Sequence, residues 1–351
     1  MRAHYGLSLG QVGFLIAAPS LGAVVSLLPW GVAADRLGER LVLVVGVGVD
    51  GVCLIAAARA GSFEVLAVLL LLAGLAGASV NSASGRAVAA WFPPAQRGLA
   101  LAVRQTAVPI GGFVTALALP PLVHADGVGS GFAALGIASL AGAAIAGLVL
   151  RDIPVIAHEH VMAGVSPYRS RPLWLLSLGS ALVIGPQLTL TGFAVLFLHA
   201  HRDLTPARAA AVLAVVQLLG IAGRLGAGRW SDLVGSRVGP LRIIALVMTV
   251  FLAATAATVD APLPVLVPVL VVACVLSMSW NSLSFAGAIE LAGPERSGAA
   301  IGLQQTLLGI AGSVYPVAFG FLVAASSWRA GIGVIGALPL AGWFVLGRVR
   351  G

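Results

Sequence analysis

The chain has 351 residues, of which 59% are hydrophobic and only 9% are charged, and its mean hydropathy is +1.05. A soluble domain is about one quarter charged, so this composition excludes a soluble globular protein and predicts a membrane protein. The net charge of +8 is divided among separate loops and forms no continuous basic face, so nucleic-acid binding is not expected.

Apolar runs of about 20 residues, the length that crosses ~30 Å of hydrocarbon, recur along the whole chain. The eleven transmembrane helices that they predict are 9–34, 41–62, 64–91, 97–122, 130–150, 172–199, 206–230, 239–259, 262–291, 297–324 and 329–347. These runs are too long for the strands of a β-barrel and do not alternate, so an all-α membrane protein is expected.

Arg residues orient the predicted helices. Fourteen of the 20 Arg residues lie near the loops of one side, five lie on the other side, and Arg104 lies inside a helix. Because basic residues are enriched in cytoplasmic loops, the Arg-rich side and the C-terminal Gly351 are predicted to be cytoplasmic. A chain without Lys and rich in Arg and Ala is typical of a GC-rich genome, so the expected location is the bacterial cytoplasmic (inner) membrane.

A charged hairpin follows the first predicted helix, and a second copy occurs 197 residues later. The residues that share this spacing are Gly31, Asp35, Arg36, Gly38 and Arg40 in the first copy, and Gly228, Asp232, Gly235 and Arg237 in the second. Gly permits a tight turn, Asp can accept hydrogen bonds from a helix N-terminus, and Arg stays out of the lipid. One copy would be an ordinary charged turn, but two equivalent copies favour a cytoplasmic gating loop.

A longer repeat divides the chain. Residues 81–118 align without a gap to residues 281–318, with 12 identities in 38 positions. The repeat predicts two homologous bundles, 1–150 and 172–351, joined by a polar cytoplasmic linker at 151–171. Helix 172–199 has no counterpart in the first half, so five helices are expected there against six in the second. A late start site, a trimmed sequence or a natural eleven-helix protein would each explain this difference.

These features resemble the major facilitator superfamily. Its loop signature, Gly-x-x-x-Asp-(Arg/Lys)-x-Gly-x-(Arg/Lys), is matched by the first hairpin, and by the second except at Leu233, where a basic residue is usual. The resemblance implies two pseudo-symmetric bundles that work by alternating access around a midplane substrate site. The stretch 91–112 also resembles members of the family that carry small anions.

Arg104 is the main candidate substrate ligand. It lies seven residues, or roughly 10 Å, inside its predicted helix, and its counterpart in the repeat is the neutral Gln304. A guanidinium in a water-lined cavity is a forked donor that suits a carboxylate or a similar planar anion. The alternative is a structural ion pair with another helix, for which Asp50 is the candidate partner.

Further candidate ligands lie on helices that the resemblance places beside the cavity. They are Arg224, Gln105, Gln304, Gln305, Asn81 and Asn281. Arg224 lies on a helix on which carboxylate-transporting relatives often carry a basic residue, although it can also extend to the cytoplasmic interface. The symmetric pair Asn81 and Asn281 is interpreted first as a source of hydrogen bonds between helices.

Two carboxyl groups are candidates for proton coupling. Asp50 lies nine residues, or ~13 Å, inside its span, where structural pairing is the alternative role. Glu290 lies near the cytoplasmic end of its span and is interpreted first as a gate or surface residue. No enzyme, metal or cofactor motif is present, because Cys53 and Cys274 are far apart and no Lys is available for a Walker motif.

The predicted function is secondary transport of a small organic (monocarboxylate-like) or inorganic anion, with protons as the candidate coupling ion and the lipid bilayer as the environment of a monomer. One alternative is a drug or metabolite exporter of the same superfamily. Stretch 66–80, where such exporters usually carry an Arg, has no charge, which disfavours this alternative. The other alternative is a non-transporting sensor or a relic carrier.

Overall fold

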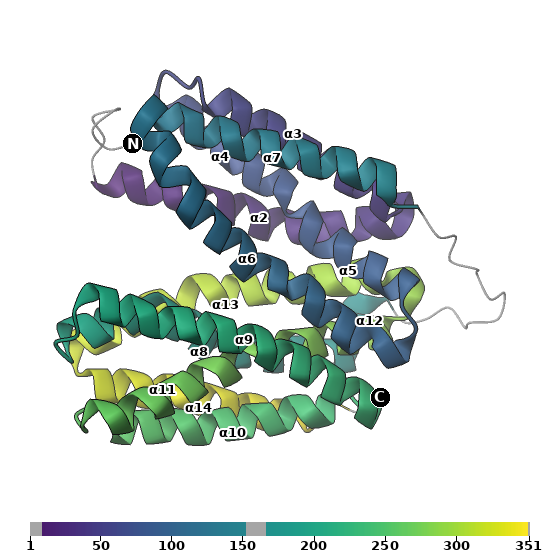
Figure 1. Cartoon of the computed structure of the whole chain (residues 1–351). Helices are drawn as coiled ribbons and strands as arrows, with labels where there is room; N and C mark the ends of the chain where they lie inside the picture. The colour runs from purple at the N-terminus through teal and green to yellow at the C-terminus, as the bar shows by residue number, and fades with distance from the viewer. Residues whose placement is uncertain (1–8, 152–165, 350–351) are drawn as a thin grey trace. The chain divides into compact units, whose positions relative to one another are not determined.

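The computed structural model describes residues 9–151 and 166–349, and all of its regular elements are helices (Figure 1). The helices are α2 (Leu9–Leu37), α3 (Glu39–Ala57), α4 (Phe63–Gly77), α5 (Ser79–Trp91), α6 (Pro94–Asp126), α7 (Val128–Val149), η1 (Pro167–Arg169), α8 (Arg171–Ala200), α9 (Pro206–Val234), α10 (Val238–Ala257), α11 (Leu263–Met278), α12 (Asn281–Ala292), η2 (Pro294–Arg296), α13 (Ser297–Ala325) and α14 (Trp328–Leu346).

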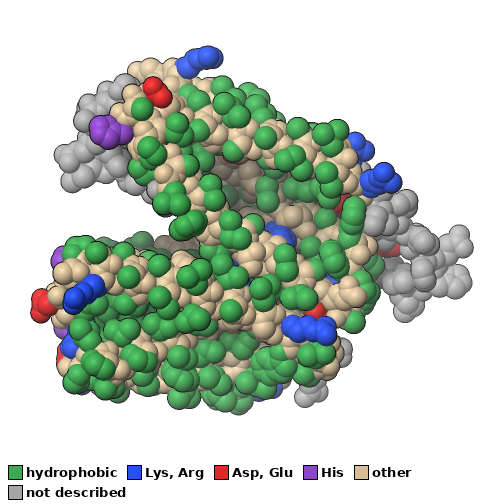
Figure 2. All heavy atoms as spheres, viewed as in Figure 1, with side chains coloured by type: hydrophobic (Ala, Val, Ile, Leu, Met, Phe, Trp, Pro, Cys, Tyr) green, Lys and Arg blue, Asp and Glu red, His purple; other side chains and the backbone are tan. Residues whose placement is uncertain are grey.

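The prediction of an all-α membrane protein is confirmed. Eleven segments of the described chain are long and apolar enough to cross a membrane, in the order that the sequence predicts. Figure 2 shows hydrophobic side chains over most of the visible helix surface, with charged side chains mostly toward the helix ends. This distribution suits helices surrounded by lipid tails. The linker predicted at 151–171 falls mostly outside the described residues.

Two spans that were predicted as continuous helices are each divided into two helices, although their outer bounds agree with the prediction. The span at 64–91 divides at Ala78 into α4 and α5, and the span at 262–291 divides at 279–280 into α11 and α12. Carbonyl groups just before each break accept hydrogen bonds from side chains of a neighbouring helix, α2 in the first case and α9 in the second. A membrane helix can break where its neighbours satisfy the freed backbone groups, and averaged hydropathy does not detect this.

The chain packs as two compact units. Unit 1 contains Met1–Trp91, Val108–Pro167 and Ala292–Thr306, and unit 2 contains Phe92–Ala107, Tyr168–Leu291 and Leu307–Gly351. Helices α6 and α13 therefore each begin in one unit and end in the other. Each unit includes the first turns of a helix from the other half of the sequence. The division at the linker between residues 150 and 172 stays a prediction.

The same helix pairs pack in both units. In unit 1, α3 packs along α7, and α4 packs against α2 and α3 (Figure 1). In unit 2, α10 packs along α14, and α11 packs against α9 and α10. Close crossings use Gly, since a Cβ on Gly51 of α3 would lie 2.8 Å from the carbonyl oxygen of Gly136 in α7. The pairing follows the order that the internal repeat predicts.

The two units differ at the helix α8. In unit 2, α8 covers the small residues of α13 and α14, because a Cβ on Gly312 would lie 2.9 Å from Leu188 and one on Gly342 would lie 3.0 Å from the oxygen of Gly179. The matching Gly112 of α6 and Gly142 of α7 are exposed. Among the described residues, unit 1 has no helix that corresponds to α8.

Candidate functional site

The carboxylate of Asp35 binds the start of α13 within unit 1. Asp35 lies in the last turn of α2 and accepts hydrogen bonds from the backbone N–H of Gly298 at 2.8 Å and of Ala299 at 2.7 Å. The first amides of a helix have no intrahelical partner, and the helix dipole makes this end partly positive. A carboxylate at this point therefore caps α13. We call this contact, with the side chains that support it, the first latch.

An equivalent second latch lies within unit 2. Asp232, near the end of α9, accepts hydrogen bonds from the backbone N–H of Gly98 at 2.9 Å and of Leu99 at 2.8 Å, near the start of α6. Each Asp of the repeated hairpin thus holds the beginning of a helix from the other half of the sequence. The sequence predicted that these Asp residues could bind a helix N-terminus, and the structure identifies which one.

Close backbone contacts explain two of the hairpin glycines. A Cβ on Gly31 would overlap the carbonyl oxygen of Gly298, and a Cβ on Gly228 would lie 2.5 Å from that of Gly98. Real Cβ atoms do not approach a backbone oxygen so closely, so any side chain here would separate the helices. The second glycine of each hairpin has a different role, because Gly38 (φ 86°) and Gly235 (φ 65°) adopt positive φ at the turn.

Each latch contains an Arg with two acidic partners. The two latches differ in whether the Arg or the second acid belongs to the hairpin. In the first latch, Arg86 of α5 lies 3.4 Å from Asp35 and also pairs with the fully buried Glu39 at the start of α3. The Arg therefore belongs to the helix and the second acid to the hairpin. Sequence reasoning missed both Arg86 and Glu39, although Glu39 lies inside the repeated hairpin.

In the second latch the hairpin supplies the Arg and the helix supplies the second acid. Arg237 binds Asp232 at 2.6 Å and Glu290 of α12 at 2.8 Å, and it also donates to the carbonyl of Pro94. Glu290 is thus part of the latch. In the first hairpin, by contrast, Arg40 donates to the carbonyl of Gly147 at the end of α7.

Arg36 is the remaining charged residue of the hairpins. Its side chain is exposed and makes no hydrogen bond or ion pair within the described part of the chain. It therefore does not belong to the first latch.

Arg104 and Arg224 meet at one residue within unit 2. Arg104 of α6 donates a 3.0 Å hydrogen bond to the side-chain oxygen of Gln105. Arg224 of α9 donates a 2.8 Å bond to the backbone oxygen of the same Gln105 and another of 2.8 Å to the carbonyl of Met278. Arg224 is only 4% exposed. Three of the residues predicted to bind substrate are therefore brought together, and we call them the arginine pair and its Gln.

The break between α11 and α12 supplies the carbonyl that holds Arg224. Helix α11 ends at Met278, and the carbonyls before the break are satisfied by side chains, with Trp280 Nε1 donating to Ser277 at 2.8 Å. Arg224 makes no ion pair with an acidic side chain in the described residues, since both of its partners are carbonyl oxygens. Two carbonyl dipoles therefore hold the guanidinium of Arg224 in position, and no acidic side chain of the described residues neutralises its charge.

The other predicted ligands lie elsewhere. Asn281 belongs to unit 2 with the arginine pair and is 5% exposed, whereas Gln304, Gln305 and Asn81 belong to unit 1. Gln304 is fully buried, so the counterpart of Arg104 in the repeat is a core residue. Their role in binding stays a prediction.

Asp50 is bound to a neutral partner. Its carboxylate accepts a 2.7 Å hydrogen bond from the hydroxyl of Ser139 in α7. The sequence suggested Asp50 as an ion-pair partner for Arg104, and the structure gives it Ser139. The two carboxyl groups considered for proton coupling therefore have different surroundings, since Glu290 is paired with Arg237.

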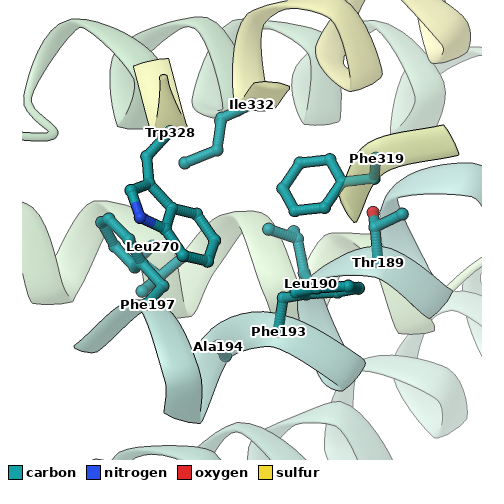
Figure 3. Close-up of a pocket in the computed structure, with 9 residues that line it drawn as sticks. All are labelled: Thr189, Leu190, Phe193, Ala194, Phe197, Leu270, Phe319, Trp328 and Ile332. Atoms are coloured by element: carbon teal, nitrogen blue, oxygen red, sulfur yellow. The ribbon is translucent and has the colours of Figure 1, made fainter. Parts of the chain in front are cut away.

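A separate apolar pocket lies between α8, α11, α13 and α14 in unit 2 (Figure 3). Aromatic side chains converge there, with the ring centroids of Phe193 and Phe319, and of Phe197 and Trp328, 5.1 Å apart. The hydroxyl of Thr189 is already bonded to the carbonyl of Gly185 at 2.8 Å. The pocket offers no free polar group to an anion, and no cluster of metal-binding side chains occurs in residues 9–151 and 166–349.

Known proteins resemble this chain over most of its length. A family model described as Major Facilitator Superfamily matches residues 1–316. An uncharacterized MFS-type transporter of Mycobacterium tuberculosis (strain CDC 1551 / Oshkosh) is 38% identical over 343 residues, which cover 96% of this chain and 76% of that protein. A probable sulfoacetate transporter of Cupriavidus necator is 26% identical over 349 residues, which cover 92% of this chain and 81% of that protein.

A solved structure has the same fold. The crystal structure of the E. coli fucose:proton symporter matches with a TM-score of 0.77 at 16% sequence identity, over 98% of this chain and 92% of that chain. At this identity the match concerns the fold alone.

Proposed function

The chain belongs to the major facilitator superfamily of transporters, and from that premise we propose that it carries a small anion across the bacterial cytoplasmic membrane as a secondary transporter. Transporters of this fold work by alternating access, in which two bundles rock about a site near the middle of the bilayer. The proposed substrate is a monocarboxylate-like organic anion or a small inorganic anion.

The observation that carries this proposal is the convergence of Arg104 and Arg224 on Gln105. Charged groups inside a membrane are costly, so two Arg side chains that bond to the same residue indicate a functional need for positive charge. Neither Arg has a basic counterpart in the repeat, where Gln304 and Leu27 occupy the matching positions. A small substrate has no two-fold symmetry, and an asymmetric pair of cations suits an asymmetric anion.

The geometry of the pair favours an anion with oxygen ligands. A guanidinium presents a planar set of donors that matches a carboxylate or sulfonate in a two-bond arrangement. Because carbonyl groups hold Arg224 in place, its charge is available to a ligand without first breaking an ion pair. The similar C. necator protein is named a probable sulfoacetate transporter, and sulfoacetate carries both acidic groups.

The two latches supply the conformational step in this proposal. Both are engaged in the structure, and Asp35 and Asp232 each hold the start of one helix. Opening toward the cytoplasm would require both carboxylates to leave their amides. Proton coupling, a monomeric state and a cytoplasmic C-terminus belong to the same proposal, the last because most Arg residues lie on that side.

Uptake by proteoliposomes tests the substrate class. The purified protein is expected to accumulate labelled lactate, sulfoacetate or nitrate, and Arg104→Gln is expected to reduce the initial rate at least tenfold. Arg224→Leu introduces the residue of the first repeat and is expected to have a similar effect. Arg208→Gln removes an exposed charge from the same helix as Arg224 and serves as the matched control.

The outcomes separate the alternatives. If Arg104→Gln carries anions as fast as the parent, Arg104 is structural and the proposed site is wrong. If the parent moves neutral or cationic compounds and no anion, the exporter alternative holds. If reconstituted protein with both latches intact moves nothing at all, the sensor or relic alternative gains support.

A further inference from the structure

Asp50 is a carboxyl group inside the membrane that the anion site does not use. It lies in α3, seven residues, or about 10 Å, from the extracytoplasmic end of that helix at Ala57. Its side chain is half-buried between α3 and α7, where Ser139 donates to it at 2.7 Å. An ionisable group at this depth is costly to maintain and is a candidate functional group for that reason.

The second unit shows that the packing does not need this pair. Helix α10 corresponds to α3 and carries no acidic residue between Val238 and Ala257. Pro339 of α14 stands at the position that matches Ser139, at the offset of 200 that aligns residues 81–118 with 281–318. Helices α10 and α14 nevertheless also pack along each other. An apolar contact therefore suffices for the fold, and the polar pair of unit 1 has another purpose.

No cation neutralises Asp50 among the described residues. Ser139 is its hydrogen-bond partner on α7, and α4 approaches it through Gly77, where a Cβ would lie 3.4 Å from the Asp50 carboxylate. Along α3 itself the nearest titratable neighbour is the thiol of Cys53. A hydroxyl such as that of Ser139 can donate to a carboxylate and can accept from a carboxylic acid. The surroundings of Asp50 are therefore compatible with both protonation states.

The other intramembrane acid that could couple transport to protons has a different partner. Glu290 binds Arg237 at 2.8 Å in the second latch, so its charge is compensated there. We propose that Asp50 is the residue that binds the coupling proton. The inference rests on the proposed function as an anion transporter. The carboxylate takes up one proton from the water on one side, becomes neutral, and releases the same proton on the other side.

Two assays in proteoliposomes separate coupling from anion movement. The first measures accumulation of labelled sulfoacetate or lactate driven by a pH gradient, with a pH-sensitive dye to follow the accompanying protons. The second measures exchange of the same anion at equal pH on both sides, which needs no net proton movement. Asp50→Asn is expected to reduce gradient-driven accumulation and proton uptake at least tenfold and to leave exchange within about twofold of the parent.

Control variants keep the test decisive. Asp126→Asn removes an exposed acid at the end of α6 and is expected to behave as the parent in both assays. If Asp50→Asn is not stable, Ser139→Ala removes the hydrogen bond and keeps the carboxyl. It is expected to shift the pH profile of accumulation and leave exchange unchanged, and an unchanged profile would count against the inference.

Three results would contradict either the role of Asp50 or the proposed function. Gradient-driven accumulation by Asp50→Asn at the parental level overturns the role of Asp50. Loss of exchange together with accumulation in a folded Asp50→Asn variant also overturns it, because Asp50 would then act in anion transport itself. If the parent neither exchanges nor accumulates any of the tested anions, the proposed function fails instead.

Discussion

Asp35 and Gly298 lie 263 residues apart in the sequence, yet the carboxylate of Asp35 accepts a 2.8 Å hydrogen bond from the backbone N–H of Gly298. Asp232 and Gly98 repeat this relationship across 134 residues at 2.9 Å. The two bonds explain why the hairpin motif contains an Asp: each carboxylate caps a helix from the other half of the sequence. Four predictions concern the two latches and the arginine pair.

Removing either carboxylate charge is expected to weaken its latch. Asp35→Asn and Asp232→Asn keep the shape of the side chain, but the amide has one acceptor oxygen and so keeps one neutral bond in place of two bonds to a charged group, each of which contributes about 1.5–3 kcal/mol. We expect each variant to lower the free energy of unfolding by about 1–3 kcal/mol and to slow anion uptake several-fold. Thermal unfolding in detergent and uptake by proteoliposomes measure the two effects. Asp126→Asn is the control, and a variant that matches it in both would refute the latch.

Gly228→Ala is expected to prevent the second latch from closing. Its Cβ would lie 2.5 Å from the carbonyl oxygen of Gly98, so α9 and α6 would have to separate. We expect the uptake rate to fall at least tenfold. Gly226 provides a control on the same helix, because no atom lies within 4 Å of a Cβ added there. Gly226→Ala is expected to stay within about twofold of the parent, and equal effects of the two variants would show that helix propensity alone is responsible.

Removing the second acid is expected to destabilise the first latch more than the second. Glu39 is fully buried, and Glu39→Gln leaves the buried Arg86 with Asp35, at 3.4 Å, as its one acidic partner among the described residues. Loss of one charge of a buried pair costs about 3–5 kcal/mol. Glu290 is 35% exposed, and Arg237 keeps its bond to Asp232 after Glu290→Gln, so a cost below about 1 kcal/mol is expected. Thermal unfolding of both variants in the same detergent compares these costs.

A double variant controls this comparison. Glu39→Gln combined with Arg86→Gln removes both charges and is expected to recover part of the stability lost in Glu39→Gln alone, since the buried guanidinium is gone and Asp35 keeps its two amide partners. Similar melting temperatures for Glu39→Gln and Glu290→Gln would contradict the buried position of Glu39.

A transported anion is expected to stabilise the folded protein through the arginine pair. A ligand that binds only the folded form adds about 2.7 kcal/mol at one hundred times its dissociation constant. We expect lactate, sulfoacetate or nitrate to raise the melting temperature of the parent and of Arg208→Gln, and to have little effect on Arg104→Gln or Arg224→Leu. Undiminished stabilisation in both site variants would place the anion elsewhere in the protein.

Several parts of the site could be recognised in the sequence because they depend on local patterns. The repeated hairpins identified Asp35 and Asp232 by spacing, and the intramembrane position of Arg104 identified it as a candidate ligand. Glu39 and Arg86 gave a weaker signal, since their pairing depends on how α3 and α5 are rotated. The breaks at Ala78 and 279–280 gave no signal in a hydropathy average.

The sequence by itself determined the membrane-spanning helices, their order, the internal repeat and the family, because hydropathy and motif spacing are properties of neighbouring residues. Only the tertiary structure decided which amides bind Asp35 and Asp232, that Arg224 meets Arg104 at Gln105, and that Asp50 faces Ser139. The physical reason is that lipid tails and helix surfaces are equally apolar, so burial against another helix leaves little mark in the sequence. The rotation of each helix is instead fixed by small residues and by hydrogen bonds to partners that lie far away along the chain.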